Sequence, residues 1–307
     1  MNTTTSVFAI GITLMAPILW AALGEVVVEQ SGVLNIGIEG VMLIGAFCAA
    51  IGYRYLHNLT WGLVLAIGGG AVCGIVLSVL YVRLGTDQIV TGILFNVLAL
   101  GLTSTLYTKY LGGGVVSTYH SLKIPLLGDI KYLGTILFDQ NALVYASFLA
   151  APVVFYLVRN TWYGLYARAA SEHPRAAETA GLNVWRLRYP AVVIGCVLTA
   201  VGGATLVLST SGGFVNGLTE GRGFIALAVV VLARWNPFGV IAGCVLFGVA
   251  QALQFQIQNL GPLSHIPSDF VLMFPYAITI VAVMAARGSR YPAAIGIPYR
   301  PSSATVT

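Results

Sequence analysis

The sequence predicts an all-α protein built as a polytopic bundle of transmembrane helices. Only 8% of the 307 residues are charged, whereas an ordinary soluble domain has about 25%. Apolar residues make up 58%, and the mean hydropathy is +0.88. The apolar runs are long and continuous, unlike the alternating strands of a membrane β-barrel. These observations exclude a soluble enzyme, a disordered chain and a nucleic-acid-binding protein with a basic face.

About nine stretches have the roughly 20 mostly apolar residues that a membrane-crossing helix needs. They lie near residues 7–24, 34–52, 61–82, 88–107, 142–158, 190–208, 223–235, 238–257 and 269–286. The seventh is short and the second contains Asn35 and Glu39, so both are expected to be broken or re-entrant helices, and eight to ten spans are expected. The first lacks a positively charged start, so it is expected to be a helix of the mature protein rather than a signal peptide.

The distribution of Lys and Arg orients the expected bundle, because cytoplasmic loops carry an excess of both. If residues 159–189 face the cytoplasm and the spans alternate, ten of the 15 Lys and Arg residues lie inside and five outside. The N-terminus is then expected outside, and the tail, residues 287–307, in the cytoplasm. The long loops 112–141 and 159–189 are too short for separate domains, so residues 1–307 are expected to form one transmembrane domain.

The expected cytoplasmic loop is the most charged segment of the chain. Pro174 suits the first position of a helix, and Gly181 suits the left-handed position after its end. We expect a helix of about two turns near residues 174–180, with Ser171 or Glu172 helping to satisfy its first amides. On physical grounds alone, a solvated helix without a role is an equal alternative to a site on which a motor subunit pushes.

Polar side chains inside a membrane are costly and usually face the bundle interior or a water-filled path. Five are candidates for lining a substrate path or for fixing the broken helices, namely Asn35, Glu39, Gln88, Thr91 and Asn96. The alternative for each is a hydrogen bond between helices without ligand contact. Asn35 and Glu39 are four residues apart and are expected to share a helix face. Glu39 is the one acid expected well inside a span, and such a nearly neutral path favours an uncharged, hydrogen-bonding solute.

Two further polar groups are expected to be structural. Four glutamines crowd the end of the eighth stretch and are expected to mark an interfacial helix end; they are Gln251, Gln254, Gln256 and Gln258. Glu220 and Arg222 can form an ion pair, and the glycines beside them permit close backbone approach. A structural turn at a helix start is expected there rather than substrate contact.

Enzyme chemistry, metal binding and cofactor binding are not expected of this chain. The four cysteines lie singly in apolar stretches, and the four histidines fall in scattered loops. We find no HExxH, no GxSxG and no GxxxxGK[ST] phosphate-binding pattern. A proton-driven secondary transporter is a weaker alternative, because it would normally show several buried carboxylates.

Four ordered blocks of sequence resemble the permease subunits of ABC importers, in the branch that serves simple sugars and nucleosides and is related to the branched-chain amino-acid permeases. They run from Gly24 to Phe47, from Thr86 to Asn96, over the loop from Gly164 to Asn183, and from Glu220 to Gly248. The loop resembles the coupling loop of these permeases, and the length and the Leu34-Asn35-Ile36-Gly37 form resemble the shorter permease of bacterial nucleoside importers.

The resemblance implies a permease that moves nucleosides into the cytoplasm by alternating access, with simple sugars as the alternative substrate. It implies a multi-pass protein of the bacterial inner membrane with three partners: a second, homologous permease, a cytoplasmic ABC ATPase and an extracellular substrate-binding lipoprotein. ATP-Mg would then be used by the ATPase and not by this chain. The residues implied in coupling to the ATPase are Arg168, Glu172, Pro174, Ala177 and Gly181.

Overall fold

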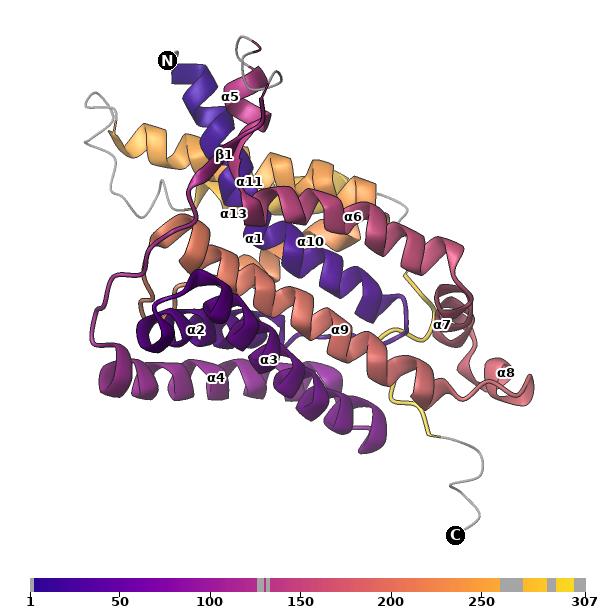
Figure 1. The fold of residues 1–307 in the computed structure, drawn as a ribbon. Helices are drawn as coiled ribbons and strands as arrows, with labels where there is room; N and C mark the ends of the chain where they lie inside the picture. The colour runs from indigo at the N-terminus through magenta and orange to yellow at the C-terminus, as the bar shows by residue number, and fades with distance from the viewer. Residues whose placement is uncertain (1–2, 126–129, 131–132, 260–272, 286–290, 301–307) are drawn as a thin grey trace.

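A computed structural model describes residues 3–125, 130, 133–259, 273–285 and 291–300, which form a bundle of helices (Figure 1). The long helices are α1 (Thr3–Glu29), α2 (Ile38–Leu56), α3 (Leu59–Ser78), α4 (Gln88–Leu106), α6 (Ala142–Asn160), α9 (Val184–Thr205) and α11 (Pro237–Asn259). The shorter ones are α5 (Leu133–Leu137), α7 (Trp162–Glu172), α8 (Pro174–Thr179), α10 (Arg222–Leu232) and α13 (Phe274–Ala285). Three π-helical turns extend α3, α4 and α9, namely η1 (Val79–Arg83), η2 (Tyr107–Leu111) and η3 (Leu206–Ser211).

Seven helices of the described chain are long and apolar enough to cross a membrane. This supports the expected polytopic bundle but does not confirm a count of about nine spans. The seventh expected stretch is the short apolar helix α10, and the ninth lies only partly within the described residues, as α13. At about 1.5 Å per residue, the 11 residues of α10 cover only about half of a hydrocarbon core roughly 30 Å thick.

Helix α9 is the centre of the packing, because α1, α2 and α3 all lie against it. Glycines allow these close approaches, as small residues do between membrane helices. A Cβ atom added to Gly203 would lie 1.9 Å from the carbonyl oxygen of Met42, and one added to Gly70 would lie 2.6 Å from the Cβ of Ala200. The contacts of Gly70 and Gly74 with α9 therefore make the packing between α3 and α9 tight.

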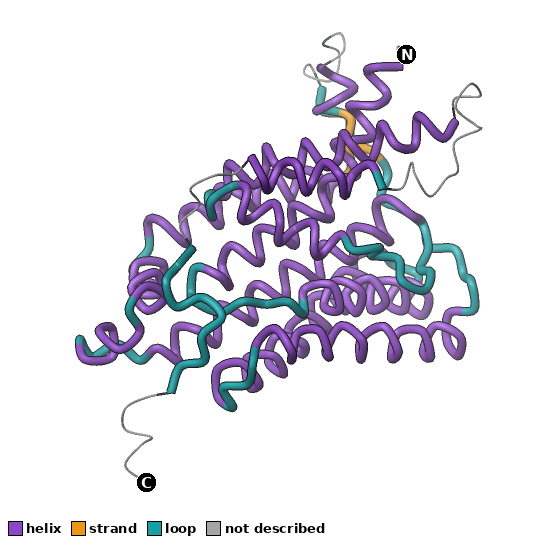
Figure 2. The backbone as a smooth tube through the Cα atoms, turned by 180° about the vertical axis from the view of Figure 1, so that it is seen from behind, coloured by secondary structure: helices purple, strands orange, loops and turns teal. Residues whose placement is uncertain are grey.

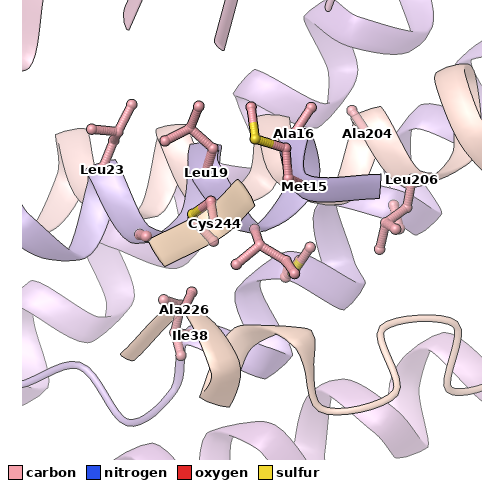
Figure 3. Packing of buried hydrophobic residues seen from close by; sticks show 14 of the residues in the cluster. Met15, Ala16, Leu19, Leu23, Ile38, Ala204, Leu206, Ala226 and Cys244 are labelled. Carbon is pink, nitrogen blue, oxygen red and sulfur yellow. The ribbon is translucent and has the colours of Figure 1, made fainter. Parts of the chain in front are cut away.

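The hydrophobic core surrounds α1, which is the most enclosed of the long helices together with α9. Figure 3 shows Met15 and Leu19 of α1 among buried side chains from other helices, such as Ile38, Leu206 and Cys244. Helix α4 contrasts with α1, because only 17% of its most apolar window is buried and most of its large apolar side chains, Phe95 excepted, are exposed. One face of the bundle is thus open to lipid or to another subunit.

The connections gather at two ends of the molecule (Figure 1). Helices α7 and α8 lie at one end, together with the loop of residues 291–300, which Figure 2 shows in teal leading to the C-terminus. The short strands β1 (Ser121–Lys123) and β2 (Asp139–Asn141) lie toward the other end and pair antiparallel, with Leu122 opposite Gln140. The charged loop and residues 291–300 of the tail, which the sequence assigns to one side of the membrane, therefore lie together.

Candidate functional site

The chain is not helical between α1 and α2, and residues 30–37 form a buried irregular segment that we call the crossing. Ser31 and Asn35 in this segment are fully buried. Irregular backbone at membrane depth requires partners for its polar groups from within the protein. The sequence predicts a broken helix in this region, and the structure shows an irregular segment followed by the start of α2 at Ile38.

Glu39 lies in the first turn of α2 and binds the start of α10, far away in the sequence. Its Oε1 accepts a hydrogen bond of 2.8 Å from the amide of Gly221, and its Oε2 accepts one of 2.7 Å from the amide of Gly223. A carboxylate at a helix N-terminus satisfies free amides and complements the helix dipole. A Cβ atom added to Gly223 would lie 2.7 Å from Glu39 Oε2, so glycine is required for this close contact.

Asn96 and Gln88 of α4 hold the other side of the crossing. The Oδ1 of Asn96 accepts a hydrogen bond of 2.8 Å from the amide of Gly40, while its Nδ2 donates one of 2.9 Å to the carbonyl oxygen of Ile36. The Oε1 of Gln88 accepts a hydrogen bond of 2.7 Å from the amide of Leu34. These side chains therefore act as interhelical anchors of the backbone.

Asn35 does not share a helix face with Glu39, because Asn35 precedes α2 in the irregular segment. That expectation is wrong, since the helix begins only at Ile38. The amide of Asn35 donates a hydrogen bond of 3.0 Å to Glu25 Oε1. Thr91 is not part of the group at the crossing; its hydroxyl lies 3.0 Å from that of Thr86.

Two acids of α1 were missed as intramembrane residues by the sequence analysis, which ended the first span at residue 24 and counted Glu39 as the one acid inside a span. Glu25 and Glu29 are fully buried in the last turns of α1. Glu29 Oε2 accepts a hydrogen bond from the indole Nε1 of Trp235. The apolar run of valines between the two acids was the signal that the helix continues.

A second group of polar residues lines a cavity of about 400 Å³. We call it the glutamine pocket and define it by Thr210, Arg222, Gln251, Gln254, Gln258 and Tyr276. The sequence predicts an interfacial helix end for these glutamines, yet Gln251 and Gln254 are only 9% and 6% exposed. The ion pair expected between Glu220 and Arg222 is present at 3.3 Å, and Glu220 also lines the pocket.

The expected coupling helix is α8, which begins at Pro174 and is followed by Gly181 with a φ of +87°. The expected capping by Ser171 or Glu172 is wrong. The residue before the helix is His173, which makes no side-chain cap, while the hydroxyl of Ser171 donates a hydrogen bond to the carbonyl oxygen of Arg168. The preceding helix α7 was not expected, and α7 and α8 together form what we call the coupling element.

The coupling element is fixed to α9 and to the tail. The hydroxyl of Tyr163 in α7 donates a hydrogen bond of 2.9 Å to the carbonyl oxygen of Leu187 in α9, and burial raises the pKa of this phenol to about 12. The amide of Ala294 donates one of 2.8 Å to the carbonyl oxygen of Ser171. Tyr163 therefore stays neutral at physiological pH, and its contact does not change there.

The candidate coupling residues divide into buried and accessible ones. Ala177 is buried against Ala170, Val184 and Tyr299, so its side chain packs inward. Glu172 and Gly181 are exposed, while Arg168 and Pro174 are partly exposed. The exposed face of α8 also carries Arg175, Ala176 and Thr179.

Residues 7–283 match the model of the family described as branched-chain amino acid transport system / permease component. The chain is 36% identical to the guanosine ABC transporter permease protein NupQ of Bacillus subtilis, over 92% of this chain and 93% of that protein. It is 32% identical to the nucleoside ABC transporter permease protein NupC of Lactococcus lactis, over 97% and 98% of the two chains.

Other relatives broaden this comparison. The chain is 34% identical to the putative glucose ABC transporter permease protein TsgC13 of Haloferax volcanii, over 79% of this chain and 75% of that protein. A second guanosine permease of Bacillus subtilis, NupP, is 26% identical over 90% of this chain and 80% of its own length. No solved structure matches the chain.

Proposed function

The chain belongs to the permease family of the branched-chain amino acid transport systems, and on this premise we propose that it is a permease subunit of an ATP-driven importer of nucleosides. The observation that carries the proposal is its 36% identity to a guanosine permease over nearly the whole of both chains. The 32% identity to a second nucleoside permease supports the same substrate class. The solute would enter the cytoplasm by alternating access.

The proposal includes three partners in a bacterial inner membrane. A second, homologous permease is supported by the similarity of this chain to both guanosine permeases of one organism. A cytoplasmic ABC ATPase would bind and hydrolyse ATP-Mg, and an extracellular lipoprotein would deliver the nucleoside. The N-terminus would lie outside, and the coupling element and tail in the cytoplasm.

The packing supports a mechanical role for the coupling element. Its exposed face is available to a partner, while α7 is hydrogen-bonded to α9 through Tyr163. Helix α9 in turn meets α2 and α3 through glycine contacts that leave no free space, as at Gly203 and Gly70. Because close-packed helices move as units rather than deform, a push on α7 and α8 would reach the bundle core through α9.

An uptake assay tests the function. Cells with and without this gene, and with and without the partner ATPase, are given labelled guanosine, adenosine, uridine, ribose, galactose or glucose. We expect nucleoside uptake that requires both genes. Uptake that survives loss of the ATPase would overturn the assignment to an ATP-driven importer.

Sugar transport is the second candidate, because the chain is 34% identical to a putative glucose permease over 79% of its length. The same assay separates the two, since uptake of a hexose or pentose without nucleoside uptake would replace the nucleoside proposal. The proton-coupled alternative predicts uptake that depends on the proton gradient without an ATPase.

The coupling role predicts that variants on the exposed face of α8 uncouple transport. We expect Arg175→Glu and Ala176→Trp to reduce nucleoside uptake at least about tenfold while the melting temperature stays unchanged, because neither side chain is buried. Lys109→Glu, a charge reversal on η2, is the matched control and should transport normally. Normal uptake by both α8 variants would contradict the coupling role.

A further inference from the structure

The glutamine pocket lies where a helix starts within the bundle. Arg222 begins the short helix α10, and Gly221 before it has a φ of +79°. The pocket is closed around this start by α1, η3, α11 and α13, from which Leu14, Thr210, Gln251 and Tyr276 come. Broken backbone inside a membrane protein is tolerated where it is buried in protein or lines a water-filled cavity.

Polar atoms without partners gather around this cavity. Arg222 Nε, Gln251 Oε1 and Thr210 Oγ1 are buried and have no hydrogen-bond partner among the described residues. Arg222 and Gln251 are only 8% and 9% exposed. A buried polar atom without a partner costs about 1–3 kcal/mol, so small side-chain rotations that bring these three atoms to a polar ligand in the cavity would be favourable.

The glutamines are arranged to meet one ligand. Gln251, Gln254 and Gln258 are three and four residues apart, so they share one face of α11, and all three line the cavity. Gln256, on the same helix, does not line the cavity.

The charge of the pocket favours a neutral ligand. The guanidinium of Arg222 is paired at 3.3 Å with the carboxylate of Glu220, and its Nη1 also donates a hydrogen bond of 2.9 Å to the carbonyl oxygen of Leu218. An anion such as a nucleotide would have to lie beside Glu220. Arg222 can still donate through its Nε, which leaves a site with hydrogen-bonding capacity and little net charge.

We infer that the glutamine pocket binds the imported nucleoside, with the amides of Gln251 and Gln254 on the hydrogen-bonding edge of its base. A side-chain amide presents a donor and an acceptor side by side, so it can form two hydrogen bonds with the donor and acceptor on one edge of a base. The ring of Tyr276 lies in the lining and offers a face for the base. The volume of about 400 Å³ is within the range of small-molecule pockets, about 300–1,000 Å³. The inference rests on the proposed function for the class of its ligand.

Glu39 is a positioning residue of this pocket. It binds the amides of Gly221 and Gly223, on both sides of Arg222. The hydroxyl of Tyr276 donates a hydrogen bond of 2.6 Å to the carbonyl oxygen of Glu220. The start of α10, where Arg222 lies, is therefore fixed from both sides, and Glu39 is assigned no contact with the substrate.

The test uses the complete transporter in proteoliposomes, with the partner permease, the ATPase and the binding lipoprotein. Labelled guanosine is compared with purine riboside, whose base lacks the exocyclic groups of guanine. We expect Gln251→Leu and Gln254→Leu each to lower kcat/KM for guanosine about five- to tenfold, the equivalent of one lost hydrogen bond, and for purine riboside less than about twofold. Guanosine monophosphate should not compete with guanosine.

Gln256→Leu is the matched control, because it makes the same change on the same helix away from the cavity. If both pocket variants transport guanosine as well as this control, the inference is overturned. A variant that does not assemble is replaced by Gln258→Leu, which is exposed at the rim and does not depend on core packing.

Failure of the proposed function gives a different result, in which the wild-type transporter takes up glucose or ribose and no nucleoside. The same variants are then assayed with that sugar. If the variants reduce sugar uptake, the ligand of the pocket is a sugar and not a nucleoside, and the pocket is still the solute site. Unchanged sugar uptake would overturn the pocket as well.

Discussion

The crossing and the glutamine pocket both place polar side chains inside the bundle, but these side chains have different partners. At the crossing, Glu39, Gln88 and Asn96 accept hydrogen bonds from backbone amides. In the pocket, Gln251 and Arg222 each have a buried polar atom that finds no partner among the described residues, and both side chains line the cavity. The comparison teaches that an intramembrane polar residue is structural when backbone groups satisfy it and a ligand candidate when they do not.

The crossing is not free of unpaired atoms, because Glu25 Oε2 and Gln88 Nε2 also lack partners among the described residues. Each of these side chains is nevertheless anchored by its other polar atom, to Asn35 and Leu34 respectively. Arg222 is anchored in the same way, to Leu218 and Glu220, whereas Gln251 has no such anchor in the described chain. The distinction therefore rests on anchoring together with the cavity, and it can be tested by variants at both places.

The largest effect is expected from Glu39→Ala. The change leaves the amides of Gly221 and Gly223 without acceptors, at about 1–3 kcal/mol each. We expect the melting temperature of the purified complex to fall by roughly 5 °C or more and nucleoside uptake to be lost. Glu39→Gln keeps one acceptor and should show an intermediate fall; a melting temperature equal to wild type in both would show that α10 does not need this carboxylate.

Asn96→Leu is expected to have the next largest effect. It removes the partners of Gly40 and Ile36, so the free energy of unfolding should decrease by about 2 kcal/mol. Thr91→Val, also on α4, is the control and should change it by less than about 0.5 kcal/mol, because the hydroxyl of Thr91 bonds to that of another exchangeable side chain, Thr86, and to no backbone group of the described residues. Equal losses from the two variants would remove the distinction between anchors and other polar residues.

Gln251→Leu is expected to change stability least and in the opposite direction. Replacing a buried amide that lacks partners by an apolar side chain of similar size removes an unsatisfied group. The melting temperature should stay the same or rise by about 1–4 °C while guanosine transport falls. A marked loss of stability in thermal unfolding would instead indicate that Gln251 is a structural residue like Asn96.

Seven of the nine expected spans match long apolar helices of the described chain, because hydropathy and length are local properties. It predicts the short seventh stretch, the break before α2 and the helix that begins at Pro174. It does not reveal that α1 continues to Glu29, because the acids there are stabilised by distant partners such as Trp235, 206 positions away. When the partners of acidic residues are unknown, a sequence reader interprets these residues as the end of a membrane-spanning helix.

The sequence draws attention to the polar residues of both regions but not to their arrangement. Glu39 was recognised as an unusual acid, yet its partners lie 182 and 184 residues away. The glutamines of α11 look like a polar helix end, because a sequence does not show that η3, α10 and α13 enclose a cavity beside them. Only the three-dimensional packing shows that Gln254 lines the cavity and Gln256 does not.

The most direct test of the account measures how far guanosine raises the melting temperature of the purified transporter, since a ligand that binds the folded state stabilises it. The account predicts that Asn96→Leu melts at a lower temperature than wild type but keeps the guanosine-induced rise. Gln251→Leu should melt near wild type and lose most of that rise. The account is contradicted if Gln251→Leu keeps the full rise, or if Asn96→Leu loses it while its melting temperature is unchanged.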